Sequence, residues 1–163
     1  MKTIRLFLIL LICFHSLNCS RNDRDNDVID PVSITYQARN NVNDQRLLED
    51  KIHYDDIIGY DSSKYAFLLT QSASDKINSY FFTAGGMPFS LELSGEKIYS
   101  GLFFPSYSSN TPCGYLVEPV IGSNNIMIVR LDYGLCPNQT EDNRNDQRLI
   151  ERLAEDDKIL KLE

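Results

Sequence analysis

The chain has few of the residues, and none of the motifs, that mark common enzyme families. Two histidines occur in 163 residues, His15 and His53. No G-x-S-x-G, H-E-x-x-H, P-loop or G-x-G-x-x-G pattern is present, and no two cysteines stand in C-x-x-C spacing. The sequence therefore argues against the hydrolases, metalloproteases and nucleotide-binding proteins that those patterns define, and we expect no cofactor and no bound metal.

The chain also lacks an apolar run long enough to cross a membrane as a helix, since such a span needs about 20 residues. The longest run, Leu6–Phe14, has nine residues. It follows Lys2 and Arg5 and precedes Cys19, an order typical of an export signal. The segment resembles a bacterial lipoprotein signal. That resemblance implies that residues 1–18 are removed and that Cys19 becomes the lipidated first residue.

The residues before Cys19 leave two alternatives open. Ser16 and Asn18 stand at positions −3 and −1, where a lipoprotein site usually has leucine and a small residue. Ordinary secretion through an atypical site, or a Cys19 that is only a free or disulfide-bonded thiol, also fits them. A lipidated Cys19 would attach the protein to a bilayer without spanning it. We then expect an outer-membrane lipoprotein of the bacterial cell envelope, on either its periplasmic or its surface face.

Three segments are predicted: the signal at residues 1–18, a flexible acidic tether at 19–31 and one domain at 32–163. The tether run Ser20–Asp27 has no aromatic or β-branched residue with which to bury apolar surface. Loss of Lys2 and Arg5 with the signal changes the formal net charge from −7 to −9. So acidic a chain is repelled by nucleic acid and by anionic lipid head groups. We therefore expect membrane contact through the lipid anchor, no nucleic acid, and an envelope protein as the candidate partner.

Cys113 and Cys136 are the other two cysteines of the predicted mature chain. An oxidising envelope compartment favours a disulfide between them. Closing a loop of this length would stabilise the fold by about 3 kcal/mol in the chain-entropy model. Two free thiols remain the main alternative, and a metal or redox role is a minor third.

Apolar periodicity predicts an α+β fold, a single small two-layer domain with a mixed or mainly antiparallel sheet and a central helix. That helix is expected over about 71–82, and a C-terminal helix over about 146–156. Residues 44–50 are predicted to form a short helix or helical turn. The pentapeptide Asn43–Leu47 recurs as Asn145–Leu149, and both copies are predicted to start helices.

Alternating apolar and polar residues predict the strands. The clearest signal is a hairpin whose turn lies at Ser94–Glu96. Its strands are predicted at 89–93 and 97–104, and further strands at 32–36, 64–70, 115–120 and 125–131.

Several short motifs lie between Tyr54 and Tyr133. They are Asp56-Ile57-Ile58-Gly59-Tyr60-Asp61, Phe67-x-Leu69-Thr70, Met87-Pro88-Phe89, Gly95-Glu96-Lys97-Ile98-Tyr99-Ser100-Gly101 and Pro105-Ser106-Tyr107-Ser108-Ser109. On these motifs, and on the closing Arg144–Arg148, the chain resembles an uncharacterised family of small bacterial secreted or lipoprotein domains. The family has no known activity, so the resemblance implies a fold and not a function.

His53 is the only histidine of the predicted mature chain, so a Ser-His-Asp or Cys-His arrangement would have to use it. The nucleophile would be Cys113 or a serine of the loop Pro105–Gly114. A half-exposed structural imidazole is the simpler interpretation. An envelope hydrolase or redox enzyme that uses Cys113 and His53 is therefore kept as an alternative.

The loop Pro105–Gly114 is the best candidate contact site, although a plain connection between strands would have the same composition. An aromatic residue among small polar ones is typical of binding surfaces. We therefore expect a lipid-anchored envelope protein that acts as a binding or structural module with no identifiable reaction. A further alternative is an inhibitor that presents this loop to a protease. The candidate contact residues are Ser106, Tyr107, Ser108, Ser109 and Asn110.

Overall fold

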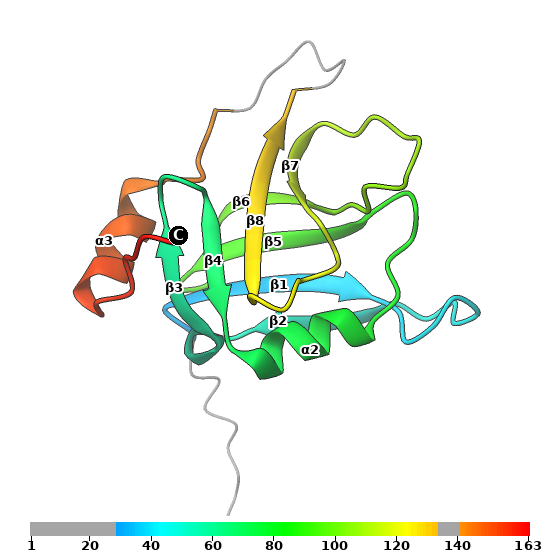
Figure 1. The fold of residues 1–163 in the computed structure, drawn as a ribbon, viewed down its shortest axis with the longest axis horizontal. Helices are drawn as coiled ribbons and strands as arrows, with labels where there is room; N and C mark the ends of the chain where they lie inside the picture. Colours follow the sequence, from blue (N-terminus) through cyan, green and yellow to red (C-terminus); the bar gives the residue numbers. More distant parts are fainter. Residues whose placement is uncertain (1–28, 134–140) are drawn as a thin grey trace, which may run out of the picture.

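The computed structural model describes residues 29–133 and 141–163. Cys19, Cys136, the predicted signal and most of the predicted tether lie outside the described residues. In the described part, eight strands form one sheet in the order β2-β1-β5-β6-β7-β8-β4-β3, and every neighbouring pair is antiparallel except β6 with β7 (Figure 1). The strands are β1 (Val32–Ala38), β2 (Leu48–Ile52), β3 (Ile57–Asp61), β4 (Ala66–Leu69), β5 (Met87–Leu93), β6 (Glu96–Phe103), β7 (Gly114–Val117) and β8 (Ile126–Asp132).

The sheet curls around its own apolar face. In Figure 1, β1, β2 and β5 run across the view, whereas β3, β4 and β8 run nearly perpendicular to them. A right-handed strand twist that accumulates over many strands produces this geometry. The side chains that line the inside come from both halves, and the largest fully buried ones include Tyr36, Tyr60, Phe67, Phe103 and Met127.

Two α-helices close the described part of the domain. Helix α2 (Gln71–Ser79) buries Ala73 and Ile77 in the core, and α3 (Gln147–Glu155) buries Leu149 and Leu153. A short 3₁₀ helix, η1 (Tyr54–Asp56), precedes β3. The α+β class and the mainly antiparallel sheet are thus as predicted. The arrangement as two layers with a central helix was wrong, because a nine-residue helix is too small to cover eight strands and the sheet covers its own face instead.

The predicted hairpin and the four other predicted strands are present, with ends shifted by up to three residues. Helix α2 begins after Thr70, whose Oγ1 accepts a hydrogen bond from the Ala73 N–H at 3.2 Å. It ends at Ser79, three residues before the predicted end.

The predicted short helix at 44–50 was wrong, since this segment leads into strand β2. The repeated pentapeptide nevertheless makes the same local turn twice. Asp44 Oδ1 accepts from the Arg46 N–H at 2.9 Å, and Asp146 Oδ1 accepts from the Arg148 N–H at 2.9 Å. Only the second copy continues as a helix, because Leu149 and Leu153 then reach the core at helical spacing.

The C-terminal tail covers the free edge of β3. The Tyr60 N–H donates to Lys158 O at 2.8 Å, and the Leu160 N–H donates to Tyr60 O at 3.0 Å. Gly59 makes room for this contact, because a Cβ there would lie 2.0 Å from Leu160 Cδ2. The tail therefore protects a sheet edge that would otherwise expose unpaired backbone groups.

Candidate functional site

The loop between β6 and β7 has an ordered backbone and an exposed tip. The Ser108 N–H donates to Pro105 O at 3.1 Å, and the Asn110 N–H donates to Ser108 Oγ at 3.3 Å. Tyr107 lies within the first of these turns and is 73% exposed. Of the five candidate contact residues, Ser108 is half-buried and the other four are exposed, so the predicted loop is accessible to a partner.

A recess of about 310 Å³ lies beside the loop, on the outer face of β8. Glu118 joins the two features, because it lines the recess and its Oε2 accepts from the Ser106 N–H at 3.0 Å. The recess is lined by Glu118, Val120, Ile126, Met127, Ile128 and Arg130.

Strand alternation sets the walls of the recess. Met127 and Val129 point into the core, so the intervening Ile128 faces outward and is half-exposed. Val120 is 70% exposed, in the connection between β7 and β8. Its neighbour Ile121 is buried and is held by the Asn78 side chain of α2. Asn78 Nδ2 donates to Ile121 O at 2.9 Å, and the Ile121 N–H donates to Asn78 Oδ1 at 2.8 Å. This contact fixes the backbone next to Val120, so an exposed aliphatic side chain stands on a rigid support.

The stretch of chain between residues 98 and 129 is almost free of charge. Glu118 is the only Asp, Glu, Lys, Arg or His between residues 98 and 129, in a chain of which 24% is charged. We call the exposed residues of this stretch the neutral surface. Its main members are Ser106, Tyr107, Ser109, Asn110, Val120 and Ile128. The sequence reasoning found the loop and missed Val120 and Ile128, although the long gap in charge was a readable signal for them.

His53 lies far from this surface. Its Nδ1 is 2.9 Å from Asp30 Oδ2, and the Lys51 Nζ is 3.8 Å from the same oxygen. In Figure 1 the junction of β2 and β3 lies at the lower left and the loop between β6 and β7 at the upper right. The structure therefore brings His53 to an acidic residue at the start of the domain, and brings it neither to Cys113 nor to the loop serines.

Cys113 is disulfide-bonded in the structure. Its predicted partner, Cys136, lies outside the described residues, so the pairing itself stays a prediction. Among the described residues, no group of three or more His, Cys, Asp or Glu side chains is placed to hold a metal ion. In the same part of the chain, no helix has the length and apolar character needed to span a bilayer.

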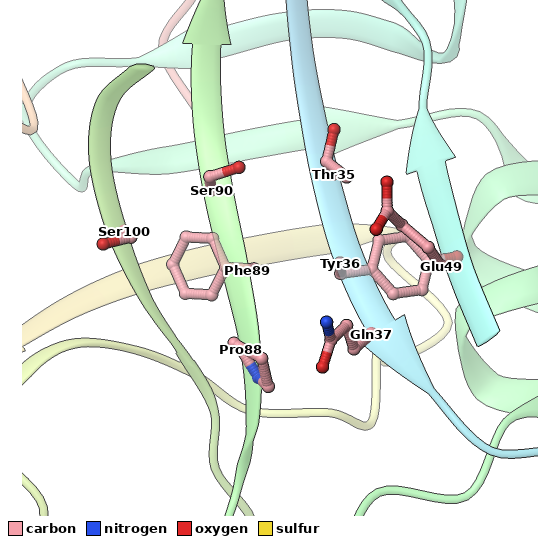
Figure 2. A pocket seen from close by; sticks show the side chains of 8 residues that line it. All are labelled: Thr35, Tyr36, Gln37, Glu49, Pro88, Phe89, Ser90 and Ser100. Carbon is pink, nitrogen blue, oxygen red and sulfur yellow. The ribbon is translucent and has the colours of Figure 1, made fainter. Parts of the chain in front are cut away.

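A second recess, of about 240 Å³, crosses the outer face of β1, β5 and β6 (Figure 2). The rings of Tyr36 and Phe89 are buried in the core, so they offer no aromatic plane to a ligand there. The polar groups that line it are hydroxyls, one amide and one carboxylate, and the exposed Pro88 adds an apolar part. The remaining lining residues are Thr35, Gln37, Glu49, Pro88, Ser90 and Ser100.

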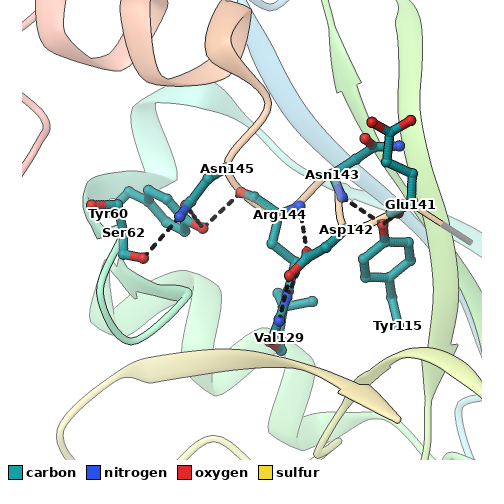
Figure 3. Close-up of polar contacts among 9 residues, drawn as sticks. All are labelled: Tyr60, Ser62, Tyr115, Val129, Glu141, Asp142, Asn143, Arg144 and Asn145. Carbon is teal, nitrogen blue, oxygen red and sulfur yellow. Dashed lines mark hydrogen bonds and ion pairs between the residues drawn. The ribbon is translucent and has the colours of Figure 1, made fainter. Parts of the chain in front are cut away.

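A network of polar contacts fastens the segment before α3 to the sheet (Figure 3). The Arg144 guanidinium donates to both oxygens of Asp142, at 2.9 and 2.7 Å, and to Val129 O at 3.2 Å. It also lies over the Tyr65 ring, 3.6 Å from the centroid. The hydrogen bond from Arg144 holds the pKa of Asp142 below its usual value. These charges satisfy one another within the fold, so they form a structural clamp and not an open site.

Comparison with protein-family models gives no match for this chain, and no curated protein or solved structure matches it either. The resemblance to small secreted or lipoprotein domains therefore stays a prediction. The functional argument rests on the geometry of the chain's own residues.

Proposed function

We propose that this protein is a lipid-anchored protein of the bacterial envelope that acts as a binding module, with the neutral surface as its contact face. One observation carries the proposal: Tyr107, Val120 and Ile128 are exposed within a stretch of an acidic protein in which Glu118 is the only charged residue. Interface centres are depleted of charged residues and enriched in tyrosine. Exposed apolar groups that cluster on a rigid surface commonly mark a protein-binding site.

The position of Asp30, just before the first strand of the domain, supports this proposal. Asp30 is held at the junction of β2 and η1 by His53 Nδ1 and by the Tyr54 N–H, at 2.9 and 3.4 Å. β1 begins at the left of Figure 1, whereas the loop between β6 and β7 lies at the upper right. An anchor that precedes Asp30 would therefore leave the neutral surface pointing away from the point of attachment.

The anchor is tested by metabolic labelling with a clickable fatty acid. We expect the wild-type protein to be labelled and Cys19→Ser to be unlabelled, because acylation needs the thiol. Equal labelling of the two proteins would remove the lipoprotein part of the proposal.

The contact face is tested by placing a photo-crosslinking amino acid at Tyr107 or at Val120 in living cells. Val42, in the loop between β1 and β2, is the matched control, because it is 63% exposed against 70% for Val120. We expect a discrete crosslinked partner from positions 107 and 120 and none from position 42. The absence of any crosslink at 107 and 120 would contradict the binding module.

A further inference from the structure

The outer edge of β3 holds an extended segment of chain, residues 159–163, which we call the tail segment (Figure 1). Tyr60 of β3 forms a parallel bridge with Ile159. The backbone oxygen of Tyr60 accepts from the Leu160 N–H at 3.0 Å. Two residues further on, Asp61 Oδ2 accepts from the Leu162 N–H at 2.8 Å. This is the geometry of strand addition at a sheet edge, in which backbone hydrogen bonds supply the affinity.

Gly59 gives this edge a preference for one side chain. A Cβ at Gly59 would lie 2.0 Å from Leu160 Cδ2 and 2.9 Å from Leu160 Cγ, so the missing Cβ leaves a notch that the leucine fills. Ile58, the preceding residue of β3, is 50% exposed and makes the surroundings of the notch apolar. In strand addition, such places for individual side chains provide the specificity.

Asp61 selects for a backbone N–H at the far end of the edge. This residue is only 2% exposed, and its Oδ1 accepts from the Ser63 hydroxyl at 2.6 Å and from the Ser63 N–H at 2.8 Å. Its Oδ2 faces the Leu162 N–H, and Lys64 Nζ donates to the Leu162 oxygen. A buried carboxylate is costly unless it is hydrogen-bonded. An edge without an occupant would therefore favour any extended segment that brings an N–H to this place.

The tail segment itself is held mainly by these edge contacts. Among the described residues, the buried core ends at Leu153, so the tail segment places no side chain in it. Ile159 is 39% exposed, and Lys161 and Glu163 are exposed as well. Segments with few buried apolar contacts open locally while the rest of a domain stays folded. The occupant of the edge can therefore be exchanged without unfolding the sheet.

We propose that the edge of β3 is a peptide-binding groove that the tail segment closes in cis, and that a partner protein enters it with an extended, leucine-containing segment parallel to β3. The chemistry of this occupant is that of the tail segment, which is seated there. The groove is separate from the neutral surface, so this inference goes beyond the proposed contact face. A competitor in the same chain has an effective concentration of the order of millimolar, which lowers the apparent affinity for the partner.

Amide hydrogen exchange on the detergent-solubilised full-length protein tests whether the tail segment opens by itself. We expect the Leu160 amide to exchange about 100-fold or more faster than the Val129 amide, which donates to Tyr65 O at 2.9 Å. Equal rates would show that the tail segment leaves only when the whole domain unfolds, and the proposal would then fail.

An acetylated peptide of residues 159–163 tests binding in trans. Leu160→Pro in the full-length protein releases the tail segment, because it removes both the N–H and the leucine side chain. The NMR shifts of the Tyr60 and Asp61 amides in isotope-labelled protein measure the affinity. We expect the peptide to bind Leu160→Pro at least about 10-fold more tightly than the wild type, and the Lys161→Ala control to match the wild type. Equal affinity for wild type and Leu160→Pro, or binding to neither, contradicts closure in cis.

The notch is tested in the same assay. A peptide with Leu160→Ala should bind the Leu160→Pro protein at least about 10-fold more weakly than the unchanged peptide. Adding Gly59→Ala to that protein should abolish binding, because the new Cβ takes the place of the leucine. Binding that ignores both changes shows that the edge does not select leucine and overturns the inference. If Leu160→Pro does not fold, Leu160→Ser, which keeps the N–H but empties the notch, replaces it with the same expected direction.

Discussion

The two sides of this domain use their polar groups in opposite ways. Around α3, most of the charged side chains are paired with groups of the same chain. On the neutral surface, hydroxyl, amide and aliphatic groups are left open to solvent. The α3 side therefore fixes the position of the C-terminal segment, and the neutral side keeps its surface available for another molecule. A binding face needs this combination of a rigid base and unpaired groups.

Tyr54 shows how closely the α3 side is fastened. Its hydroxyl donates to Asp156 Oδ2 at 2.6 Å, and the same carboxylate accepts from Arg152 at 2.6 Å. Lys158 Nζ donates to the backbone oxygens of Tyr54 and Ile57 and lies 3.8 Å from the centre of the Tyr54 ring. Burial, together with the hydrogen bond to Asp156, raises the pKa of Tyr54 to about 12. Neutral tyrosine is therefore favoured by folding, and this contribution is lost as the pH rises from about 10 to about 12.

Two glycines test how rigid the two sides are, and they carry the largest expected effects. A Cβ at Gly101, in β6, would lie 2.1 Å from the backbone oxygen of Tyr115 and 2.8 Å from Phe89 Cε1. Gly101→Ala must therefore separate β6 from β7, and we expect a loss of about 3 kcal/mol or more in the free energy of unfolding. Gly59→Ala meets the movable Leu160 side chain instead, so about 1 kcal/mol is expected. Urea unfolding measures both, and an equal loss would show that the tail is as rigid as the strand pair.

Arg144 and Arg148 form a matched pair for which we expect the next largest effects on the free energy of unfolding. Each donates through Nε and Nη2 to the aspartate two residues before it, but the Arg144 side chain is 13% exposed and the Arg148 side chain 50%. Arg144→Ala also leaves Val129 O without its donor, and we expect a loss of about 2–3 kcal/mol. Arg148→Ala should cost far less, because solvent screens an exposed pair. Equal losses in thermal unfolding would mean that burial does not decide the strength of these contacts.

The sequence predicted six of the eight strands, both helices and the exposed loop, because each leaves a local pattern: alternation, a cap or a cluster of small polar residues. It did not predict β2 or β3 as strands. It did not predict that the sheet closes on itself, since that depends on contacts such as Tyr36 with Phe103, which are distant in the chain and 5.5 Å apart between ring centres. The two copies of the pentapeptide make the same point. Asp44 and Asp146 start the same turn. The second copy continues as helix α3, with Leu149 buried in the core, whereas the first leads into strand β2 and leaves Leu47 exposed.

The candidate site was also predicted only in part from the sequence. Tyr107 was predicted from composition, whereas the recess at Val120 depends on the Asn78 side chain of a helix that is 42 residues away in the sequence. Local patterns therefore identified the loop but not the rigid support beside it.

Acid should loosen the α3 side first. Asp61 accepts hydrogen bonds from the Ser63 hydroxyl at 2.6 Å and from the Leu162 N–H at 2.8 Å, and these contacts lower its pKa to about 2. The ionised form is thus favoured by folding. Its stabilising contribution is present above about pH 3.8 and is lost as the pH falls towards about 2. In melting temperatures across this range, Asp61→Asn should lie below the wild type at pH 5 and approach it near pH 2. Asp55→Asn, which changes an exposed carboxylate, is the control and should follow the wild type throughout.

The smallest effect on the free energy of unfolding is expected at the contact between His53 and Asp30. The His53 side chain is 59% exposed, and its contact with Asp30 is a surface ion pair when the imidazole is protonated. His53→Ala should therefore change the free energy of unfolding by less than about 0.5 kcal/mol. It should also leave crosslinking through Tyr107 unchanged, because Asp30 and the loop lie at opposite ends of the domain. If a His53→Ala protein folds normally but no longer restores the phenotype of cells that lack the protein, that result would instead favour the enzyme alternative. That result would place the functional site at His53 and not on the neutral surface.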